Sequence, residues 1–247
     1  MPGVCLPYLE WGQCDVEGCR LEHLPADHPG VLDMLATHWL AHADDGFAMT
    51  AGNVFEQTAV ELDDDCADCP SPTCCVYPTA AQADQLAAAL RACAAVRKLV
   101  SVGAGDGFLE GQLERRGMPT TAVDLDVLAD PSRYRPMRRF CSQIVRVRPD
   151  ALLEIAEPEA TALLFVWGAK LPWEAYMARY PQVPLVAIVG DPEPGECCAT
   201  TPSSAALEGR PGWRRVLNAP IRAVRRNSML AVYVRDAPGE ALCLVGE

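Results

Sequence analysis

Residues 99–126 read LVSVGAGDGFLEGQLERRGMPTTAVDLD. The segment opens on a short apolar run and continues with three glycines, Gly103, Gly105 and Gly107. A helical pattern follows, and a second apolar run ends at Asp124. This succession predicts a strand, a glycine-rich turn, a helix and a second strand that carries an acid at its tip. Such a unit is typical of an α/β sheet that holds a nucleotide-type ligand at the turn.

The spacing of the glycines narrows the class of ligand. The dinucleotide fingerprint needs a glycine or alanine where this chain has Phe108. The phosphate-binding P-loop needs a lysine and then a serine or threonine after its last glycine, and neither stands here. The G-x-G-x-G loop, with an acid about twenty residues later, instead resembles motifs I and II of the class I S-adenosylmethionine-dependent methyltransferases. A glycine turn without a ligand and a nicotinamide site remain as alternatives.

The resemblance implies that S-adenosylmethionine binds over the loop. Glycine lets the backbone turn sharply and approach a ligand closely. The helix that begins near Phe108 offers N–H groups and a positive dipole end to the carboxylate of the ligand. Asp124 would accept hydrogen bonds from both ribose hydroxyls. The cofactor-binding residues implied in this segment are Gly103, Ala104, Gly105, Asp106, Gly107 and Asp124.

The later part of the chain predicts a doubly wound, mostly parallel sheet. A helix is expected over 83–95, and strands are expected at 143–149, 160–168, 184–191 and 228–236. The last strand is expected to be antiparallel and to pair with the region around 216–224 or with 241–245. The resemblance therefore covers about 80–236. It implies that Asp150 lies near the adenine amino group and that Trp167, at the end of the fourth strand, lies where the substrate enters.

No motif names the atom that is methylated. The fourth strand ends in WGAKLPW, which lacks the Asn/Asp-Pro-Pro-aromatic tetrad of amino-group methylators. The Cys69–Pro70 pair stands ahead of the domain, not after the fourth strand as in cytosine-carbon methylators. Methyl transfer is driven mainly by positioning and can proceed without a conspicuous acid or base. The acceptor therefore stays open.

A separate module is expected at the front of the chain. All four histidines lie within the first 42 residues, and seven of the twelve cysteines lie within the first 75. Cys5, Cys14, Cys19 and His23 have the spacing C-x8-C-x4-C-x3-H, which resembles CCCH zinc fingers. Three thiolates and one imidazole satisfy tetrahedral zinc, and so short a segment has too little core to fold without the metal.

A second metal site is a weaker expectation. Its candidate ligands are Cys66, Cys69, Cys74, Cys75, His38 and His42. The two histidines are four residues apart on one face of an expected helix. Histidines on a helix face can equally be ordinary polar positions, and adjacent cysteines are awkward joint ligands.

Charge is distributed unevenly along the chain. Residues 1–78 contain one basic residue, Arg20, against fourteen acidic ones, whereas the remainder is nearly balanced. CCCH fingers usually bind single-stranded RNA, but so acidic a module should repel phosphates. It could equally be a structural or protein-binding unit. Two arginine groups could form a basic rim for a phosphate-bearing substrate, or could be ordinary partners of nearby acids; they are Arg133, Arg135, Arg138, Arg139, Arg146 and Arg148, and Arg210, Arg214, Arg215, Arg222, Arg225 and Arg226.

These patterns predict three segments. A zinc finger is expected at 1–30, an acidic connector at 31–78, and a methyltransferase-like domain at 79–247. The favoured function is S-adenosylmethionine-dependent methyl transfer to RNA or an RNA-associated protein. The alternative is a non-catalytic adaptor that uses the acidic finger to bind protein. No apolar stretch is long enough for a membrane span, and the cysteine content fits a reducing compartment, cytoplasm or nucleus.

Overall fold

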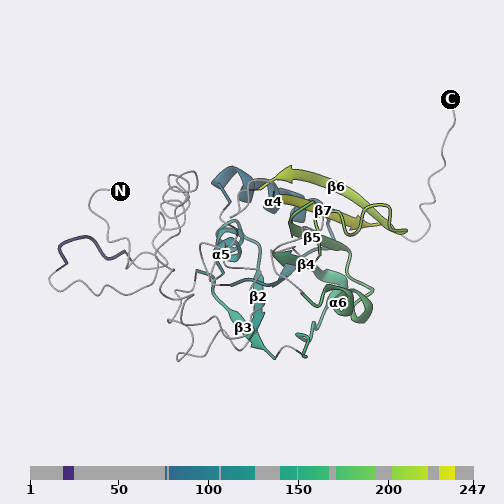
Figure 1. Cartoon of the computed structure of the whole chain (residues 1–247), viewed down its shortest axis with the longest axis horizontal. Coiled ribbons are helices and arrows are strands. Elements are labelled where there is room, and N and C mark those ends of the chain that lie inside the picture. Colours follow the sequence, from purple (N-terminus) through teal and green to yellow (C-terminus); the bar gives the residue numbers. More distant parts are fainter. Residues whose placement is uncertain are drawn as a thin grey trace.

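A computed structural model describes the fold. The described residues are 19–24, 76, 78–105, 107–125, 140–148, 150–166, 171–192, 202–221 and 228–236. Most of them belong to one sheet with helices against its faces (Figure 1). In this part of the chain no helix is long and apolar enough to cross a membrane.

The sheet has seven strands in the order β3-β2-β1-β4-β5-β7-β6. They are β1 (Lys98–Val102), β2 (Thr120–Leu125), β3 (Ile144–Val147), β4 (Thr161–Val166), β5 (Leu185–Gly190), β6 (Trp213–Pro220) and β7 (Met229–Arg235). The first five are parallel to one another, and β7 is antiparallel to both β5 and β6. The chain builds outward from β1 to β3 and then returns to place β4 on the other side of β1. The strand order therefore reverses between β1 and β4, which in open α/β sheets is where ligands bind.

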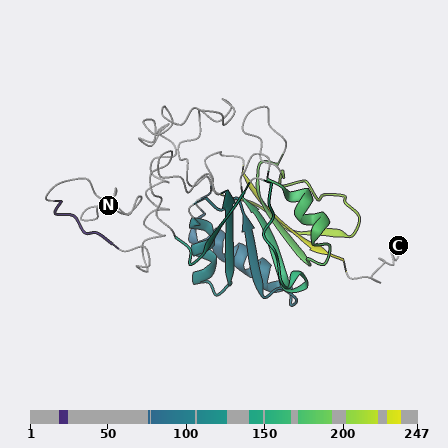
Figure 2. The same ribbon diagram turned by 90° about the horizontal axis from the view of Figure 1, so that it is seen from below.

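The helices cover both faces of the sheet. α4 (Ala80–Ala92) and α5 (Phe108–Arg115) pack on one face, and α6 (Trp173–Arg179) packs on the other (Figure 2). A short 3-10 helix, η3 (Pro158–Ala160), leads into β4. Thr79 and Gln82 form a reciprocal capping box at the start of α4, which fixes where that helix begins. The protein has a Rossmann-like α/β fold.

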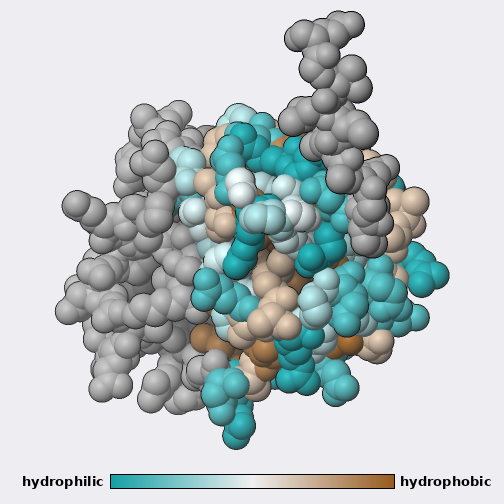
Figure 3. Space-filling view, turned by 90° about the vertical axis from the view of Figure 1, so that its right-hand side faces the viewer, coloured by the Kyte–Doolittle hydropathy of each residue, from teal (hydrophilic) through white to brown (hydrophobic). Residues whose placement is uncertain are grey.

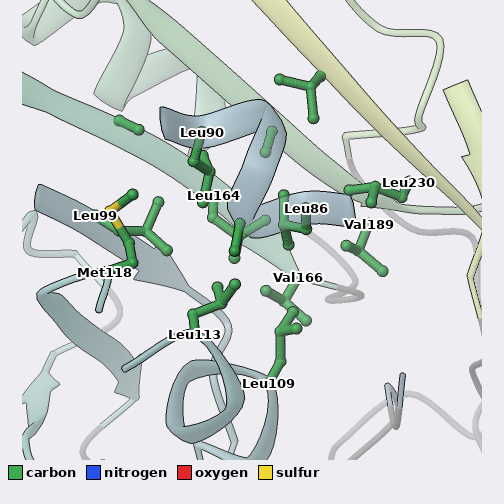
Figure 4. Close-up of a cluster of buried hydrophobic side chains, with 14 of the residues drawn as sticks. Leu86, Leu90, Leu99, Leu109, Leu113, Met118, Leu164, Val166, Val189 and Leu230 are labelled. Carbon is green, nitrogen blue, oxygen red and sulfur yellow. The ribbon is translucent and has the colours of Figure 1, made fainter. Parts of the chain in front are cut away.

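An apolar layer joins α4 and α5 to the sheet. Leu86 and Leu90 of α4 and Leu109 and Leu113 of α5 point toward the strands (Figure 4). All four are at most 2% exposed. Such burial contributes about 1.5–3 kcal/mol for each side chain of this size. Val76 joins the same cluster, so the packed core begins at least four residues before α4.

The opposite face has its own core, built largely around α6. Tyr176 and Tyr180 are buried there, and their hydroxyls bind the backbone that follows β3. The hydroxyl of Tyr176 accepts from Leu153 N at 2.9 Å, and that of Tyr180 donates to Leu153 O at 2.8 Å. Each buried phenol therefore has a polar partner, and the pair fixes the segment between β3 and β4.

The sequence predictions of the elements are largely confirmed. Each expected strand is present with slightly shorter bounds, and the inward orientation of Leu109 and Leu113 is correct. The first helix begins and ends three residues earlier than expected, because Thr79 caps it. The last strand is antiparallel as expected, and its partners are β5 and β6. The alternative partner, 241–245, lies outside the described residues.

Candidate ligand-binding site at the glycine loop

The glycine loop lies at the carboxyl end of β1, beside the point where the strand order reverses. The N–H groups of Gly103 and Ala104 donate to the carbonyl of Val123 on β2, at 3.0 and 3.2 Å. Gly103, Gly105 and Gly107 all have positive φ, at 86°, 59° and 81°. Side chains other than glycine rarely adopt these angles, so the backbone path itself requires the three glycines.

Two of these glycines also have a packing reason that involves no ligand. A Cβ at Gly103 would lie 2.6 Å from the carbonyl oxygen of Val166, the last residue of β4. A Cβ at Gly107 would collide with the sulfur of Cys141. The first and third glycines thus allow the protein to pack against itself.

Asp124 lies where the sequence predicts the ribose acceptor, at the carboxyl end of β2. Its Oδ2 accepts a hydrogen bond from Gly105 N, and its Oδ1 accepts from Leu125 N at 2.7 Å. Burial raises the pKa of this carboxyl above its ordinary value. The two backbone hydrogen bonds and the charge of Arg146 oppose that rise. Each carboxylate oxygen keeps a further lone pair that can accept from a ligand hydroxyl.

Arg146 is a neighbour of Asp124. The sequence placed it within an arginine group and not beside this acid. It stands opposite Asp124 in the β2–β3 register, so both side chains are on the same face of the sheet. Its Nη1 is buried and has no hydrogen-bond partner within the described residues. Arg146 therefore supplies a positive charge beside the acceptor.

A second buried acid lies beneath the loop, and sequence reasoning missed it. Glu110, in the first turn of α5, is 1% exposed, and its Oε1 accepts from Ser101 Oγ at 2.5 Å. Its Oε2 is buried and has no hydrogen-bond partner in the described part of the chain. Burial raises the pKa of Glu110 to about 7, with smaller contributions from the charges of Asp124 and Glu114.

The burial of Glu110 follows from what surrounds α5. The sheet and α4 cover two sides of the helix. Phe140 and Cys141 cover a third side, because Gly107 and Gly111 leave room for them. A Cβ at Gly111 would collide with the carbonyl of Phe140. The glycine inside the helical pattern was the available sequence signal, because glycine is about 1 kcal/mol less favourable than alanine in a helix and its presence there calls for another reason.

Of the other predicted cofactor residues, Asp150 is described and two are not. Asp150 follows β3 at the same edge of the sheet, but its side chain is 73% exposed and pairs with Arg148 at 3.4 Å. Its expected contact with adenine stays a prediction. Asp106 and Trp167 lie outside the described residues.

Of the two alternatives for the second arginine group, Arg214 and Arg215 fit the one in which arginines are partners of nearby acids. Arg214 stands level with Leu185 across β7, at the amino-terminal end of β5 and therefore at the edge opposite the loop. Arg214 lies 3.9 Å from Asp236, and Arg215 lies 2.8 Å from Glu208. These are ordinary ion pairs of exposed side chains. The side of the molecule that lies at the right in Figure 1 carries intermixed hydrophilic and hydrophobic residues (Figure 3). The guanidinium of Arg210 packs over the ring of Trp173 instead.

Of the remaining arginines in the two groups, two are described. Arg146 and Arg148 lie at the carboxyl end of β3, on the side of the loop. Outside the described residues are Arg133, Arg135, Arg138, Arg139, Arg222, Arg225 and Arg226.

The metal predictions fall mostly outside the described residues. Of the first set only Cys19 and His23 are described, and Cys5 and Cys14 are not. The whole second set is also outside, namely Cys66, Cys69, Cys74, Cys75, His38 and His42. Within the described ranges no group of three or more His, Cys, Asp or Glu could hold a metal ion.

No protein-family model matches this sequence, and no curated protein matches it. Among solved structures, the methyltransferase domain of bacterial CtHen1-CN is similar at 13% identity, over 62% of this chain and 97% of that chain, with a TM-score of 0.40. Magnesium protoporphyrin IX methyltransferase (ChlM) from Synechocystis PCC 6803, solved with bound SAH, is similar at 11% identity over 83% and 99%, with a TM-score of 0.42.

The glycopeptide N-methyltransferase MtfA, complexed with sinefungin, is similar at 13% identity over 67% of this chain and 98% of that chain, with a TM-score of 0.42. The strand order and glycine loop of this chain define a Rossmann-like α/β protein with a candidate nucleoside site where the strand order reverses.

Proposed function

We propose that this protein binds S-adenosylmethionine over the glycine loop and transfers its methyl group. One observation carries the proposal: the N–H of Gly105 is bonded to the carboxylate of Asp124. That bond brings the middle glycine of the loop and a ribose-type acceptor together, beside the reversal of strand order. The first and third glycines are required by internal packing, so Gly105 is the position left for close approach by a ligand.

The residues present fit this cofactor. Asp124 has lone pairs left for the ribose hydroxyls. Gly107, the N-cap of α5, makes no side-chain cap hydrogen bond, and this positive dipole end suits the carboxylate of the ligand. The loop carries no lysine or arginine, which suits an uncharged ribose better than a pyrophosphate. When bound, the cofactor supplies an electrophilic methyl group on a sulfonium.

Calorimetric titration with S-adenosylmethionine tests the proposal. The wild-type chain should bind, and Gly105→Arg should not, because the arginine would fill the space above the loop. Gly117→Arg is the matched control: Gly117 also has positive φ, at 79°, but a Cβ there meets nothing within 4 Å. Both variants place an arginine at a residue with positive φ, 59° at Gly105 and 79° at Gly117, so the comparison tests the location of the new side chain. Absence of binding by the zinc-loaded wild-type protein would refute the proposal.

For the acceptor, RNA or an RNA-associated protein is our proposal. It is supported by the CCCH-like spacing at the front of the chain and by Arg146 and Arg148 on the loop side of the sheet. Arginine binds phosphate groups in a bidentate manner. Incubation with labelled S-adenosylmethionine and separate RNA and protein fractions should label one of the two. Cofactor binding without transfer to either fraction would favour the adaptor alternative.

The zinc finger is a separate proposal. Cys5, Cys14, Cys19 and His23 together provide three thiolates and an imidazole, the donor set of a closed structural zinc site. Elemental analysis of freshly purified protein should find zinc, and its complete absence would contradict the assignment. The second ligand set would appear in the same measurement as zinc in excess of one ion per chain.

A further inference from the structure

A buried carboxyl group under the glycine loop has no part in the proposed binding scheme. Glu110 is 1% exposed, and one of its oxygens has no hydrogen-bond partner among the described residues. A buried carboxylate without a cationic partner is costly, and such groups become neutral instead. The position is therefore one that can gain or lose a charge directly below the loop.

Among the described residues, Glu110 has a polar partner on one side and no paired cation. Ser101 on β1 donates to its Oε1 at 2.5 Å. The charged groups that act on it are Asp124 on β2 and Glu114 on α5, both acidic. Arg146 on β3 faces Asp124 rather than Glu110. Asp84 and Arg91 of α4 both contact Arg116 at the far end of α5, where Asp84 pairs with its side chain at 2.6 Å and Arg91 donates to its carbonyl at 2.6 Å. The described charges that act on Glu110 are therefore both negative, and a positively charged ligand nearby would stabilise its ionised form.

We propose that Glu110 is a positioning and specificity residue whose ionisation strengthens binding of a positively charged ligand over a neutral one at the glycine loop. The inference rests on the proposed function, because it takes S-adenosylmethionine as the ligand. Its sulfonium is positively charged, whereas the sulfur of the product, S-adenosylhomocysteine, is neutral. The two ligands share the adenine, the ribose and the amino-acid part. An ionised Glu110 therefore distinguishes cofactor from spent product by charge alone.

The direction of the pH effect follows from the proton. With a pKa of about 7, Glu110 is largely neutral below that pH and largely ionised above it. Binding of the sulfonium favours the ionised form, so the carboxyl releases a proton to solvent as the cofactor binds. The preference for S-adenosylmethionine over S-adenosylhomocysteine should therefore rise as the pH increases through about 7.

The test is calorimetric titration of both ligands into the full zinc-loaded chain, between about pH 6 and about pH 8. The ratio of the two dissociation constants should change by at least about threefold in favour of S-adenosylmethionine, as expected for one charge in a partly screened site. Titration near pH 7 in buffers of different ionisation enthalpy should show release of a fraction of a proton with S-adenosylmethionine, and less with S-adenosylhomocysteine.

Two variants separate Glu110 from other titrating groups. Glu110→Gln keeps the shape of the side chain and an acceptor for Ser101 but cannot ionise. At every pH, the ratio of its two dissociation constants should therefore stay close to the ratio that wild type shows at low pH. Glu174→Gln is the matched control, because Glu174 is exposed in the first turn of α6 and should keep the wild-type pH dependence. Ser101→Ala removes a hydrogen bond that lowers the pKa of Glu110, so its transition should move to higher pH.

The outcomes distinguish the inference from the function on which it rests. If neither ligand binds at any pH, the proposed function fails. If both ligands bind but wild type and Glu110→Gln show the same pH dependence of the ratio, the role of Glu110 is refuted and cofactor binding stands. If Glu110→Gln proves unfolded, the comparison of wild type with Ser101→Ala still tests the inference. An unchanged midpoint in the pH dependence of the ratio of dissociation constants would contradict it.

Discussion

At the scale of single residues, the site joins two acids that differ in their partners. Asp124 is held by two backbone N–H groups and has an arginine beside it. Glu110 has one hydroxyl partner and lies farther inside the fold. Both have raised pKa values because burial disfavours the charged form. Environment rather than residue type therefore sets which of the two carboxyls is available to a ligand and which responds to pH.

Glu110 should make the stability of the protein depend on pH. Its pKa is about 7 in the folded chain against an ordinary 4.5, so the folded state binds more protons between these values. Stability should therefore fall as the pH rises from about 4.5 to about 7. Glu110→Gln should not show this loss. Its free energy of unfolding should exceed that of wild type by up to about 3 kcal/mol at pH 8, with a much smaller difference at pH 5.

Urea denaturation of both proteins at several pH values measures this difference. The control Glu174→Gln should differ from wild type by a constant amount, because Glu174 is exposed. Parallel pH curves for wild type and Glu110→Gln would show that Glu110 titrates at an ordinary pKa in the folded chain.

At the scale of elements, α5 is the part that organises the site. It begins at the end of the loop, carries Glu110 in its first turn, and is buried on nearly every side from Phe108 to Leu113. Gly107 and Gly111 lie four residues apart on one face and let Phe140 and Cys141 approach. The helix is thus wedged between the sheet, α4 and a later segment of chain. This packing fixes the loop whether or not a ligand is present.

Gly111→Ala tests that packing, because the steric collision and the helix propensity of alanine predict opposite changes in stability. Alanine is about 1 kcal/mol better than glycine inside a helix, so propensity alone predicts stabilisation. The added Cβ would collide with the carbonyl of Phe140, which is backbone and cannot move cheaply. We expect a net loss of about 1–3 kcal/mol in the free energy of unfolding, together with weaker binding of S-adenosylmethionine. Denaturation showing a variant at least as stable as wild type would contradict the close contact.

At the scale of the whole molecule, the sheet region contains every described residue of the site. The loop, Asp124, Glu110 and Arg146 are held by elements between α4 and β4. The ligands of the proposed zinc finger come from the front of the chain, before Leu24. Cofactor binding and zinc binding therefore depend on different parts of the sequence. Removal of the metal should affect the cofactor site and the front of the chain differently.

Chelation of zinc should leave the affinity for S-adenosylmethionine within about twofold of its value in the metal-loaded protein, while the front of the chain loses its structure. Calorimetry before and after treatment with a strong chelator measures the first effect, and proteolysis of the first 30 residues measures the second. Re-addition of zinc is the control for irreversible damage. A large loss of affinity on chelation would mean that the zinc-binding segment takes part in the cofactor site.

Much of the fold could be predicted from the sequence, because its elements are local patterns. The apolar runs that became β1, β4 and β5 are buried on both faces, and the leucine spacing of α5 sets its inward face. The glycines and Asp124 were found by their spacing. Whether Arg214 and Arg215 lie at the site or pair with nearby acids stayed open, because neighbours in sequence do not reveal which end of a strand faces the site.

The sequence by itself determined a strand–loop–helix–strand unit with an acid at its tip, since backbone conformation and amphipathic period are properties of short segments. Only the tertiary structure decided that Gly103 and Gly107 serve internal packing, that Gly105 meets Asp124, and that Glu110 is buried beneath the loop. These features depend on contacts with β4, with Cys141 and with the sheet. Burial and close approach arise between segments that are far apart in the chain, so no local pattern contains them.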